Sequence, residues 1–311
     1  MPTQLLDFLR YLTQKTYQEQ GDAQAAAELN WRRVAAPPLP RGLTLQWLGT
    51  SGFLLEHQGY ALLIDPYASR VPLSAALSGA VVQPDRARID RHLPRADAIL
   101  IGHTHFDHAM DAPIVARRDG CQVYGSRSLA TLMAAHGLAG RAVEVEVYRE
   151  YPLGPFTVTF VPSVHSKLVL GWAIPSSGDI TCEHFDGLAC NAYGCGQVYG
   201  IHVAVAGVTL YHQGSADLLE DAIRHRGVDI FLAGIAGRGF TRDYTARIVR
   251  ALAPACVLPH HHDDFFRGLD EAMRFSLNVN LARFVDEVRA VSRDLPVVTL
   301  DPLQRAANAA S

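Results

Sequence analysis

The sequence feature that most constrains the fold is a short apolar run that ends in a cluster of metal-ligand side chains. Residues 98–101 are typical of a buried β-strand, because Ala, Ile, Leu and Ile follow one another without a polar interruption. The segment from His103 to His108 follows closely and contains three histidines and one aspartate. Side chains alternate along an extended chain, so we expect His103 and His105 to point the same way.

This cluster predicts a metal site. Imidazole nitrogens and carboxylate oxygens are the ligands that zinc and similar divalent ions take in proteins. The alternative is a polar loop with scattered histidines, and it accounts poorly for four ligand-type side chains in six positions after one strand. Residues 109–116 could begin a helix behind the cluster.

Other ligand-type residues also stand just past predicted strands. Asp65 ends an apolar run, and His165 follows the alternating strand at 156–162. Three consecutive histidines, His260 to His262, come soon after the strand at 256–258. We therefore expect residues far apart in the chain to complete the site.

The chain divides into an N-terminal extension and a main domain. Residues 3–34 are predicted to be helical, broken at Gly21, with Asp22 capping a second helix. The proline-rich residues 37–42 form a stiff linker. The expected division is 1–40 for the helical extension and its linker, and 41–311 for the main domain.

The main domain is predicted to be α/β. It contains two groups of meander strands, each followed by alternating strands and helices. The predicted strands are 43–48, 53–56, 60–65, 98–101, 122–125, 142–148, 156–162, 198–205, 208–212, 229–233, 256–258 and 297–300. The predicted helices lie near 128–135, at 244–253 and at 269–292. Residues 171–195 are predicted to be a long loop, of the kind that forms lids or binding surfaces.

Composition narrows the class of partner. The net charge of −3 gives no support to nucleic-acid binding, which needs a basic surface. The N-terminus lacks a signal-peptide pattern, and no apolar stretch approaches the ~20 residues of a membrane span. Five cysteines without close pairs fit a reducing compartment. We expect a cytoplasmic protein with a small-molecule substrate, and a homo-oligomer is an open alternative.

Over residues 43–301 the chain resembles the metallo-β-lactamase-fold hydrolase superfamily, whose motifs it carries in order. Residues 103–108 match the signature H-x-H-x-D-H. Asp65, His165 and residues 259–261 correspond to further motifs. The Pro-x-His form of the last motif is similar to the branch that contains L-ascorbate-6-phosphate lactonase and N-acyl-phosphatidylethanolamine phospholipase D.

The resemblance implies a four-layer αββα sandwich with metal at one edge between two sheets. It implies zinc, one or two ions per chain, with manganese or iron as alternatives. The implied ligands of the first and second ions are, respectively, His103, His105 and His165, and Asp107, His108 and His261. Asp107 and His261 are also the expected catalytic residues. Asp65 would lie outside the ligand set and orient a ligand or the motif loop.

The sequence departs from the superfamily where an aspartate usually bridges both metals, because the corresponding residue is Ser215. Three alternatives follow: two ions without a protein bridge, one ion held by the three histidines, or replacement of the bridge by Asp217. A weakened second site is the favoured interpretation, with Ser215 near the ions without being a ligand.

Several other residues are weaker candidates. Among the three consecutive histidines the motif spacing favours His261 as the ligand, then His262. Arg238 follows a strand end and is a candidate anion contact for the substrate, although a solvated loop arginine is the commoner case. Cys182, Cys190 and Cys195 do not have zinc-site spacing. The histidines expected at the surface are His57, His92, His136 and His225.

The leading hypothesis is a zinc-dependent hydrolase of an ester, lactone, amide or phosphodiester of a small molecule. Metal-bound hydroxide would attack the carbonyl or phosphoryl centre. The alternatives are a lipid phosphodiesterase of the phospholipase D type and a non-catalytic metal-binding protein with a degenerate second site.

Overall fold

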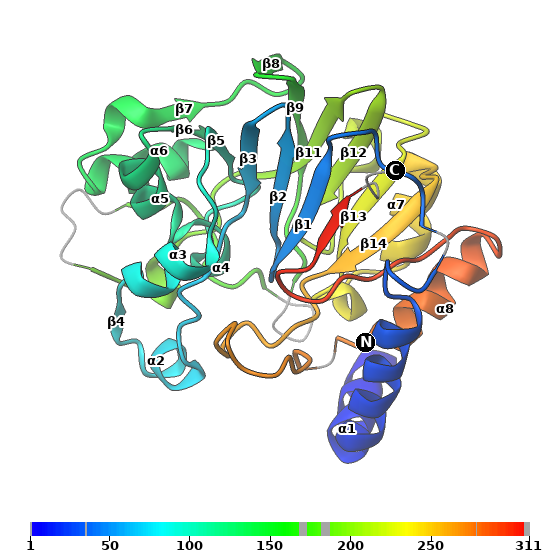
Figure 1. Ribbon diagram of the computed structural model, residues 1–311. Helices are drawn as coiled ribbons and strands as arrows, with labels where there is room; N and C mark the ends of the chain where they lie inside the picture. The colour runs from blue at the N-terminus through cyan, green and yellow to red at the C-terminus, as the bar shows by residue number, and fades with distance from the viewer. Residues whose placement is uncertain (1, 35, 168–172, 182–186, 278, 308–311) are drawn as a thin grey trace.

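The computed structural model describes residues 2–34, 36–167, 173–181, 187–277 and 279–307, with side chains from Thr13 onward. Two β-sheets lie face to face, and helices cover the outer side of each (Figure 1). This arrangement is the expected four-layer αββα sandwich, and it confirms the α/β class. None of the described helices is long and apolar enough to cross a membrane.

The first sheet has seven strands in the order β15-β1-β2-β3-β5-β6-β7. Its strands are β1 Thr44–Gly49, β2 Gly52–His57, β3 Tyr60–Ile64, β5 Ala98–Leu100, β6 Gln122–Gly125, β7 Ala142–Glu144 and β15 Arg305–Ala307. β1, β2 and β3 form an antiparallel meander, whereas β3, β5, β6 and β7 run parallel. A separate two-stranded sheet pairs β4 Val81–Val82 with β10 Leu188–Ala189.

The second sheet has six strands in the order β14-β13-β12-β11-β9-β8. Its strands are β8 Glu150–Leu153, β9 Phe156–Ser163, β11 Val198–Val205, β12 Val208–Gln213, β13 Ile230–Gly234 and β14 Cys256–His260. The last three are parallel to one another, so their carboxyl ends meet at one edge. That edge faces the carboxyl ends of β3 and β5, which places the ligand-type residues together.

Helices lie on the outer faces of both sheets (Figure 1). The α-helices of the described chain are α1 Pro2–Glu28, α2 Leu73–Ser78, α3 Arg86–His92, α4 Phe106–Ala109, α5 Ala112–Asp119, α6 Arg127–Ala135, α7 Tyr244–Leu252 and α8 Leu281–Val291. Short 3-10 turns are η1 Ala139–Arg141, η2 Cys190–Ala192, η3 Glu220–Ala222 and η4 Arg238–Phe240. α5 and α6 pack on the first sheet, and α7 and α8 on the second.

Three apolar cores hold the layers together. In β3, Leu62 and Ile64 point into the core between the two sheets, whereas Leu63 points into the core under α5 and α6. The third core contains Phe231 of β13 and Phe284 of α8. Strands with both faces buried need no polar alternation, which explains why their sequences are continuous apolar runs.

The structure corrects two predictions near the C-terminus. The predicted helix at 269–292 is wrong over its first half, because α8 begins only at Leu281. Before it, Ser276 donates its backbone N–H to His262 O at 2.9 Å, so this segment pairs with the chain after β14 instead of coiling. The strand at 297–300 is also absent: Val297 and Thr299 make only isolated bridges, and β15 closes the first sheet.

The N-terminal helix differs from its prediction too. α1 continues through Gly21 and is irregular instead at Gln14, where φ is −115° and ψ is 16°. Asp22 does not cap its own helix. Its Oδ1 accepts the backbone N–H of Ala282 at 2.9 Å, in the first turn of α8. Asp22 therefore ties the N-terminal helix to the second half of the domain.

Candidate metal centre

The structure gathers six side chains into two groups suited to metal binding. The first group contains His103, His105 and His165, and the second contains Asp107, His108 and His261. Within each group the potential ligand atoms lie within 4.8 Å of one another. All six side chains are buried. The donors are five imidazoles and one carboxylate, a set that suits zinc and iron.

Each side chain reaches the site from the end of a secondary-structure element. His103 and His105 follow β5, and α4 then turns Asp107 and His108 back toward them. His165 lies two residues beyond β9. His261 follows β14 directly, so the two sheets bring candidate ligands to one edge of the sandwich.

Nitrogen atoms converge inside the cluster. His103 Nε2 lies 3.1 Å from His105 Nδ1, and His261 Nε2 lies 3.2 Å from Asp107 Oδ2. The rings of His103 and His108 are 3.8 Å apart between centroids, so the two groups are adjacent. Several imidazole nitrogens pointing at one another are poorly satisfied by hydrogen bonds alone, and a cation between them suits their lone pairs.

The outward nitrogens of two of these histidines face backbone carbonyls. His105 Nε2 lies 2.9 Å from Pro175 O, and His165 Nδ1 lies 2.8 Å from Ser166 O. Because a carbonyl only accepts, each of these nitrogens carries the proton. The opposite nitrogen of each ring therefore presents a lone pair to the cluster, as metal-binding histidines require.

Burial and mutual proximity keep two of the imidazoles neutral. Burial, and then neighbouring His105, lower the pKa of His165 to about 3. Burial and then neighbouring His108 lower the pKa of His103 well below its usual value. Neutral imidazole is the form that binds a metal.

Asp107 and His108, in the second group, shift each other's pKa toward the charged form. Burial alone would raise the pKa of Asp107, but His108 and the hydrogen bond from His261 outweigh it and lower that pKa. Burial would lower the pKa of His108, yet the carboxylates of Asp107 and Asp65 raise it. Asp107 is therefore ionised at neutral pH.

Asp65 stands directly behind the motif. Its Oδ1 accepts the backbone N–H of Gly102 at 2.7 Å, and its Oδ2 lies 2.8 Å from His108 Nδ1. A Cβ atom added to Gly214 would stand 2.9 Å from the same carboxylate, so glycine permits this close approach. The carboxylate is positioned to orient both the motif loop and His108.

Ser215 lines the cavity of the cluster, but it is not in either ligand group. Its Oγ accepts the backbone N–H of Ser166 at 3.1 Å, next to His165. Asp217 does not replace it, because its carboxylate accepts from Leu218 N and pairs with Arg247 at 3.5 Å. Among the described residues that line this cavity, Asp107 is the one acidic side chain.

Of the three consecutive histidines, only His261 reaches the cluster. It has a φ of 59°, and its N–H donates to Thr50 O at 2.8 Å. His260 stacks on His212, with centroids 4.8 Å apart, and His262 packs on Trp47 at 4.6 Å. The left-handed backbone at the middle residue turns its side chain away from its neighbours.

The structure does not bring Arg238 to the cluster. Its buried guanidinium donates to Glu287 Oε2 at 3.0 Å and to the carbonyl of Asn280 at 2.7 Å. These partners fix α8 to the turn after β13, so the expected anion contact is corrected to a structural ion pair. Lys167 is exposed and does not line the cavity.

The structure also places His57 and two of the cysteines of the long loop. His57 is buried at 7% exposure, although a surface position was expected, because it ends β2 against the main fold. Cys190 and Cys195 are free, buried thiols, while Cys182 and His184 lie outside the described residues. Neither thiol belongs to a metal group in the part of the chain that the structure describes.

The wall of the cavity, which has a volume of about 310 Å³, was not predicted from the sequence. Besides metal-group side chains, the lining consists of Ala76, Phe106, Pro175, Ser176, Cys190, Asn191, Gly214, Ser215, Ala236, Phe265 and Phe266. Three phenylalanines inside or just after the histidine motifs, Phe106, Phe265 and Phe266, were the sequence feature that could have indicated an apolar wall. No lysine or arginine of the described chain lines this cavity.

Arg70 and Asp263 form a buried ion pair that the sequence did not reveal. Arg70 Nη1 lies 2.7 Å from Asp263 Oδ2, and both side chains are less than 5% exposed. Asp263 Oδ1 also accepts the backbone N–H of Thr50 at 2.9 Å. The pair joins the loop after β3 to the segment after β14, and it supports the backbone that carries His261.

Comparison with known proteins gives the family of this chain. The profile of the family described as "Beta-lactamase superfamily domain" matches residues 44–261. A UPF0173 metal-dependent hydrolase of Anaeromyxobacter sp. (strain K) is 30% identical over 278 residues, covering 85% of this chain and 89% of the relative. Another, from Carboxydothermus hydrogenoformans, is 27% identical and covers 71% of this chain and 85% of its own.

Solved structures share the fold at low sequence identity. Igni18, a metallo hydrolase of Ignicoccus hospitalis, has a TM-score of 0.56 and 16% identity, covering 85% of this chain and 97% of its own. CmlA, a diiron β-hydroxylase of Streptomyces venezuelae, has a TM-score of 0.56 and 17% identity. The match covers 87% of this chain and 54% of the CmlA chain. The profile match and the curated relatives together show that this chain belongs to the metallo-β-lactamase superfamily and is a metal-dependent hydrolase.

Proposed function

We propose that the enzyme uses zinc to hydrolyse an uncharged ester, lactone or amide of a small molecule. The observation that carries this proposal is the convergence of five imidazoles and one carboxylate on a cavity whose described lining holds no lysine or arginine. Zinc, when bound, supplies an activated water at neutral pH and polarises the bond under attack.

His103, His105 and His165 are the proposed ligands of one ion, and Asp107, His108 and His261 those of a second. The contacts behind the rings support these roles, since Pro175, Ser166 and Asp65 hold outward nitrogens and leave inward ones free to bind. The phenylalanine wall keeps bulk water away from the reacting bond.

Asp107 and His261 are the proposed catalytic residues. The Asp107 carboxylate is ionised at neutral pH, so it would accept the proton released at the site and return it to the leaving group. His261, whose Nε2 lies 3.2 Å from Asp107 Oδ2, would hold the ion beside this carboxylate and keep the carboxylate in position.

We propose that the three-histidine group binds the tighter ion and that the second group binds zinc weakly. The serine at position 215 offers a hydroxyl where a bridging carboxylate would hold both ions. Asp217 is engaged by Arg247 and does not compensate. A neutral hydroxyl offsets the electrostatic repulsion between two nearby cations less than a negatively charged carboxylate does.

The character of the cavity favours an uncharged substrate over a phosphodiester. Proteins that bind phosphate groups commonly use arginine or lysine, and neither residue lines the described part of this cavity. Phe106, Phe265 and Phe266 offer apolar surface beside the metal groups instead. This feature weighs against the lipid phosphodiesterase alternative.

Hydrolysis by zinc-loaded protein tests the proposal. We expect p-nitrophenyl acetate or δ-valerolactone to be turned over faster than bis-p-nitrophenyl phosphate. His103→Ala should lower kcat/KM at least ~100-fold, because the tighter ion would be lost. The matched control is His92→Ala, a histidine paired with exposed Asp270 outside the cavity. Preferred turnover of the phosphodiester would overturn the assignment.

A further inference from the structure

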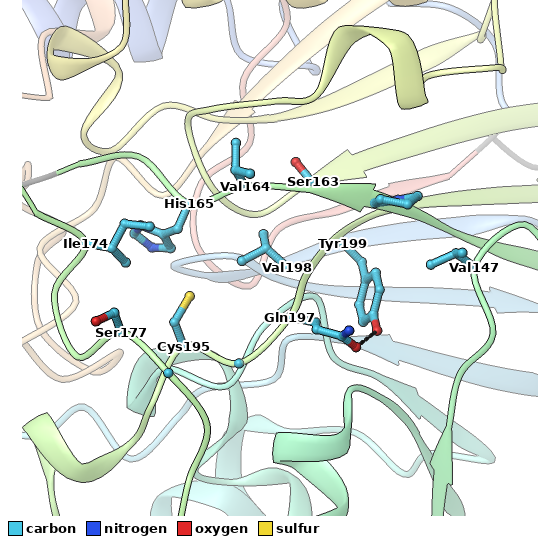
Figure 2. A pocket seen from close by; sticks show the side chains of 13 residues that line it. Val147, Ser163, Val164, His165, Ile174, Ser177, Cys195, Gln197, Val198 and Tyr199 are labelled. Carbon is cyan, nitrogen blue, oxygen red and sulfur yellow. Dashed lines mark hydrogen bonds between the residues drawn. The ribbon is translucent and has the colours of Figure 1, made fainter.

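A second cavity, of about 480 Å³, adjoins the metal centre (Figure 2). His165 lines both cavities. In Figure 2, His165 and Ile174 lie at one end, Val147 and Tyr199 at the other, and Val198 between them. The volume falls in the range that buries most of a drug-sized ligand.

One segment forms the partition between the two cavities. Ile174 and Ser177 line the second cavity, whereas Pro175 and Ser176 line the metal cavity. Pro175 O also holds His105 in place. The two cavities therefore lie on opposite sides of this segment, and His165 lies at the wall of both.

The wall of the second cavity is mainly apolar. Its apolar side chains come from the approach to β8, the end of β9, the start of β11 and the dividing segment. They include Val147, Pro162, Val164, Ile174 and Val198. No aspartate, glutamate, lysine or arginine of the described chain lines it. Such a wall favours an apolar group and penalises an unpaired charge.

The polar groups of this cavity are neutral. Tyr199 donates its hydroxyl proton to Gln197 Oε1 at 2.7 Å, and burial raises the pKa of this phenol to about 12. Burial likewise raises the pKa of the Cys195 thiol to about 12, so no thiolate forms at neutral pH. These groups offer a ligand no ion-pair partner.

We propose that the second cavity is a substrate subsite that binds an uncharged apolar arm, such as an acyl or alkyl chain, while the scissile bond lies at the metal centre. This inference rests on the proposed hydrolase function and names the class of substrate that the site selects. The enzyme acts on esters, lactones or amides with an extended apolar substituent.

Kinetics with two esters test the subsite in the zinc-loaded enzyme. Each methylene removed from water strengthens binding about fourfold, so kcat/KM should be at least ~10-fold higher for p-nitrophenyl octanoate than for p-nitrophenyl acetate. Val147→Trp should lower this octanoate-to-acetate ratio about tenfold by filling the cavity. Val147 is 43% exposed, so the larger side chain leaves the core undisturbed.

Val81→Trp is the matched control, because Val81 is 58% exposed and does not line the cavity. It should leave the ratio unchanged. Val198→Phe fills the cavity from a second wall and should act like Val147→Trp. Equal ratios in wild type and in both filling variants would overturn the subsite.

Binding of 1-octanol separates this inference from the hydrolase proposal. Titration calorimetry should show binding to the wild type, at least ~10-fold weaker binding to Val147→Trp, and unchanged binding to Val81→Trp. If no ester, lactone or amide is hydrolysed while octanol binds in this pattern, the catalytic proposal fails and the apolar subsite stands. If p-nitrophenyl acetate is hydrolysed but octanol binding does not depend on the cavity, the subsite proposal fails and the hydrolase proposal stands.

Discussion

Asp65 lies outside both candidate metal groups and can set the geometry of His108, a proposed ligand. Its two carboxylate oxygens hold Gly102 N and His108 Nδ1, so the strand end and the ligand ring are fixed to the same group. Asp65 itself adopts a φ of 44° at the end of β3, a conformation that the hydrogen bonds offset.

We expect Asp65→Asn to weaken binding of the second zinc equivalent by about 10- to 100-fold, because the neutral amide is a poorer partner for the His108 N–H. Zinc titration of metal-free protein measures this effect. Asp229→Asn is the control, since Asp229 accepts from Thr209 N and Oγ1 outside the site. Unchanged affinity in Asp65→Asn would show that this carboxylate does not position His108.

At this scale the sequence was informative about ligands and less so about their neighbours. The spacing of His103 to His108 after a buried strand predicted clustered ligand side chains, because strand and turn geometry are local. Pro175 and Ser166, which hold the outward nitrogens, carry no sequence signal because they act through backbone carbonyls. Arg238 looked free only because its partners, on α8, are distant in sequence.

At the scale of elements, the ion pair of Arg70 and Asp263 joins the loop after β3 to the segment after β14. We expect Asp263→Asn to lower the free energy of unfolding of metal-free protein by about 3 kcal/mol, since the buried guanidinium loses its counter-charge. Chemical denaturation measures the loss. The asparagine oxygen still accepts the backbone N–H of Thr50, so the variant measures the loss of the negative charge alone.

The control for this pair is Asp270→Asn, which removes an exposed partner of Arg91. That variant should unfold like the wild type, because exposed ion pairs add little stability. Should both variants unfold alike, the buried pair does not hold the two segments together.

Long-range pairing explains the failed element predictions. Residues 269–280 have helix-forming residues among them, yet Ser276 pairs with His262 and Phe275 is buried. Tertiary contacts of this kind override local propensity. By contrast, α7 and five strands of the second sheet, β9, β11, β12, β13 and β14, were predictable, since their apolar periodicity reflects burial within each element itself. The edge strand β8 was not predicted.

At the scale of the molecule, the N-terminal residues are attached to the C-terminal half. Asn30 and Gln304 exchange side-chain hydrogen bonds of 2.8 and 3.0 Å, and Thr299 Oγ1 donates to Ala26 O. We propose that residues 1–40 act as an extension of the hydrolase domain at 41–311. The four-layer fold was predictable because the superfamily motifs fix the order of strands, whereas these attachments were not.

We expect Asp22→Ala to destabilise the protein by about 1 kcal/mol, because Ala282 N–H at the start of α8 loses its acceptor. Thermal unfolding at constant pH measures the change. Asp286→Ala provides the comparison on the exposed face of α8, and it should have little effect. A melting temperature equal to that of the wild type would mean that α1 does not cap α8.

The zinc content of the protein after exhaustive dialysis against metal-free buffer tests the central claim most directly. We expect about one retained equivalent per chain in the wild type and in His261→Ala, and none in His103→Ala. The three-histidine group would then hold the tight ion, with Ser215 leaving the second site weak. Two tightly retained equivalents in the wild type, or zinc retained by His103→Ala, would contradict it.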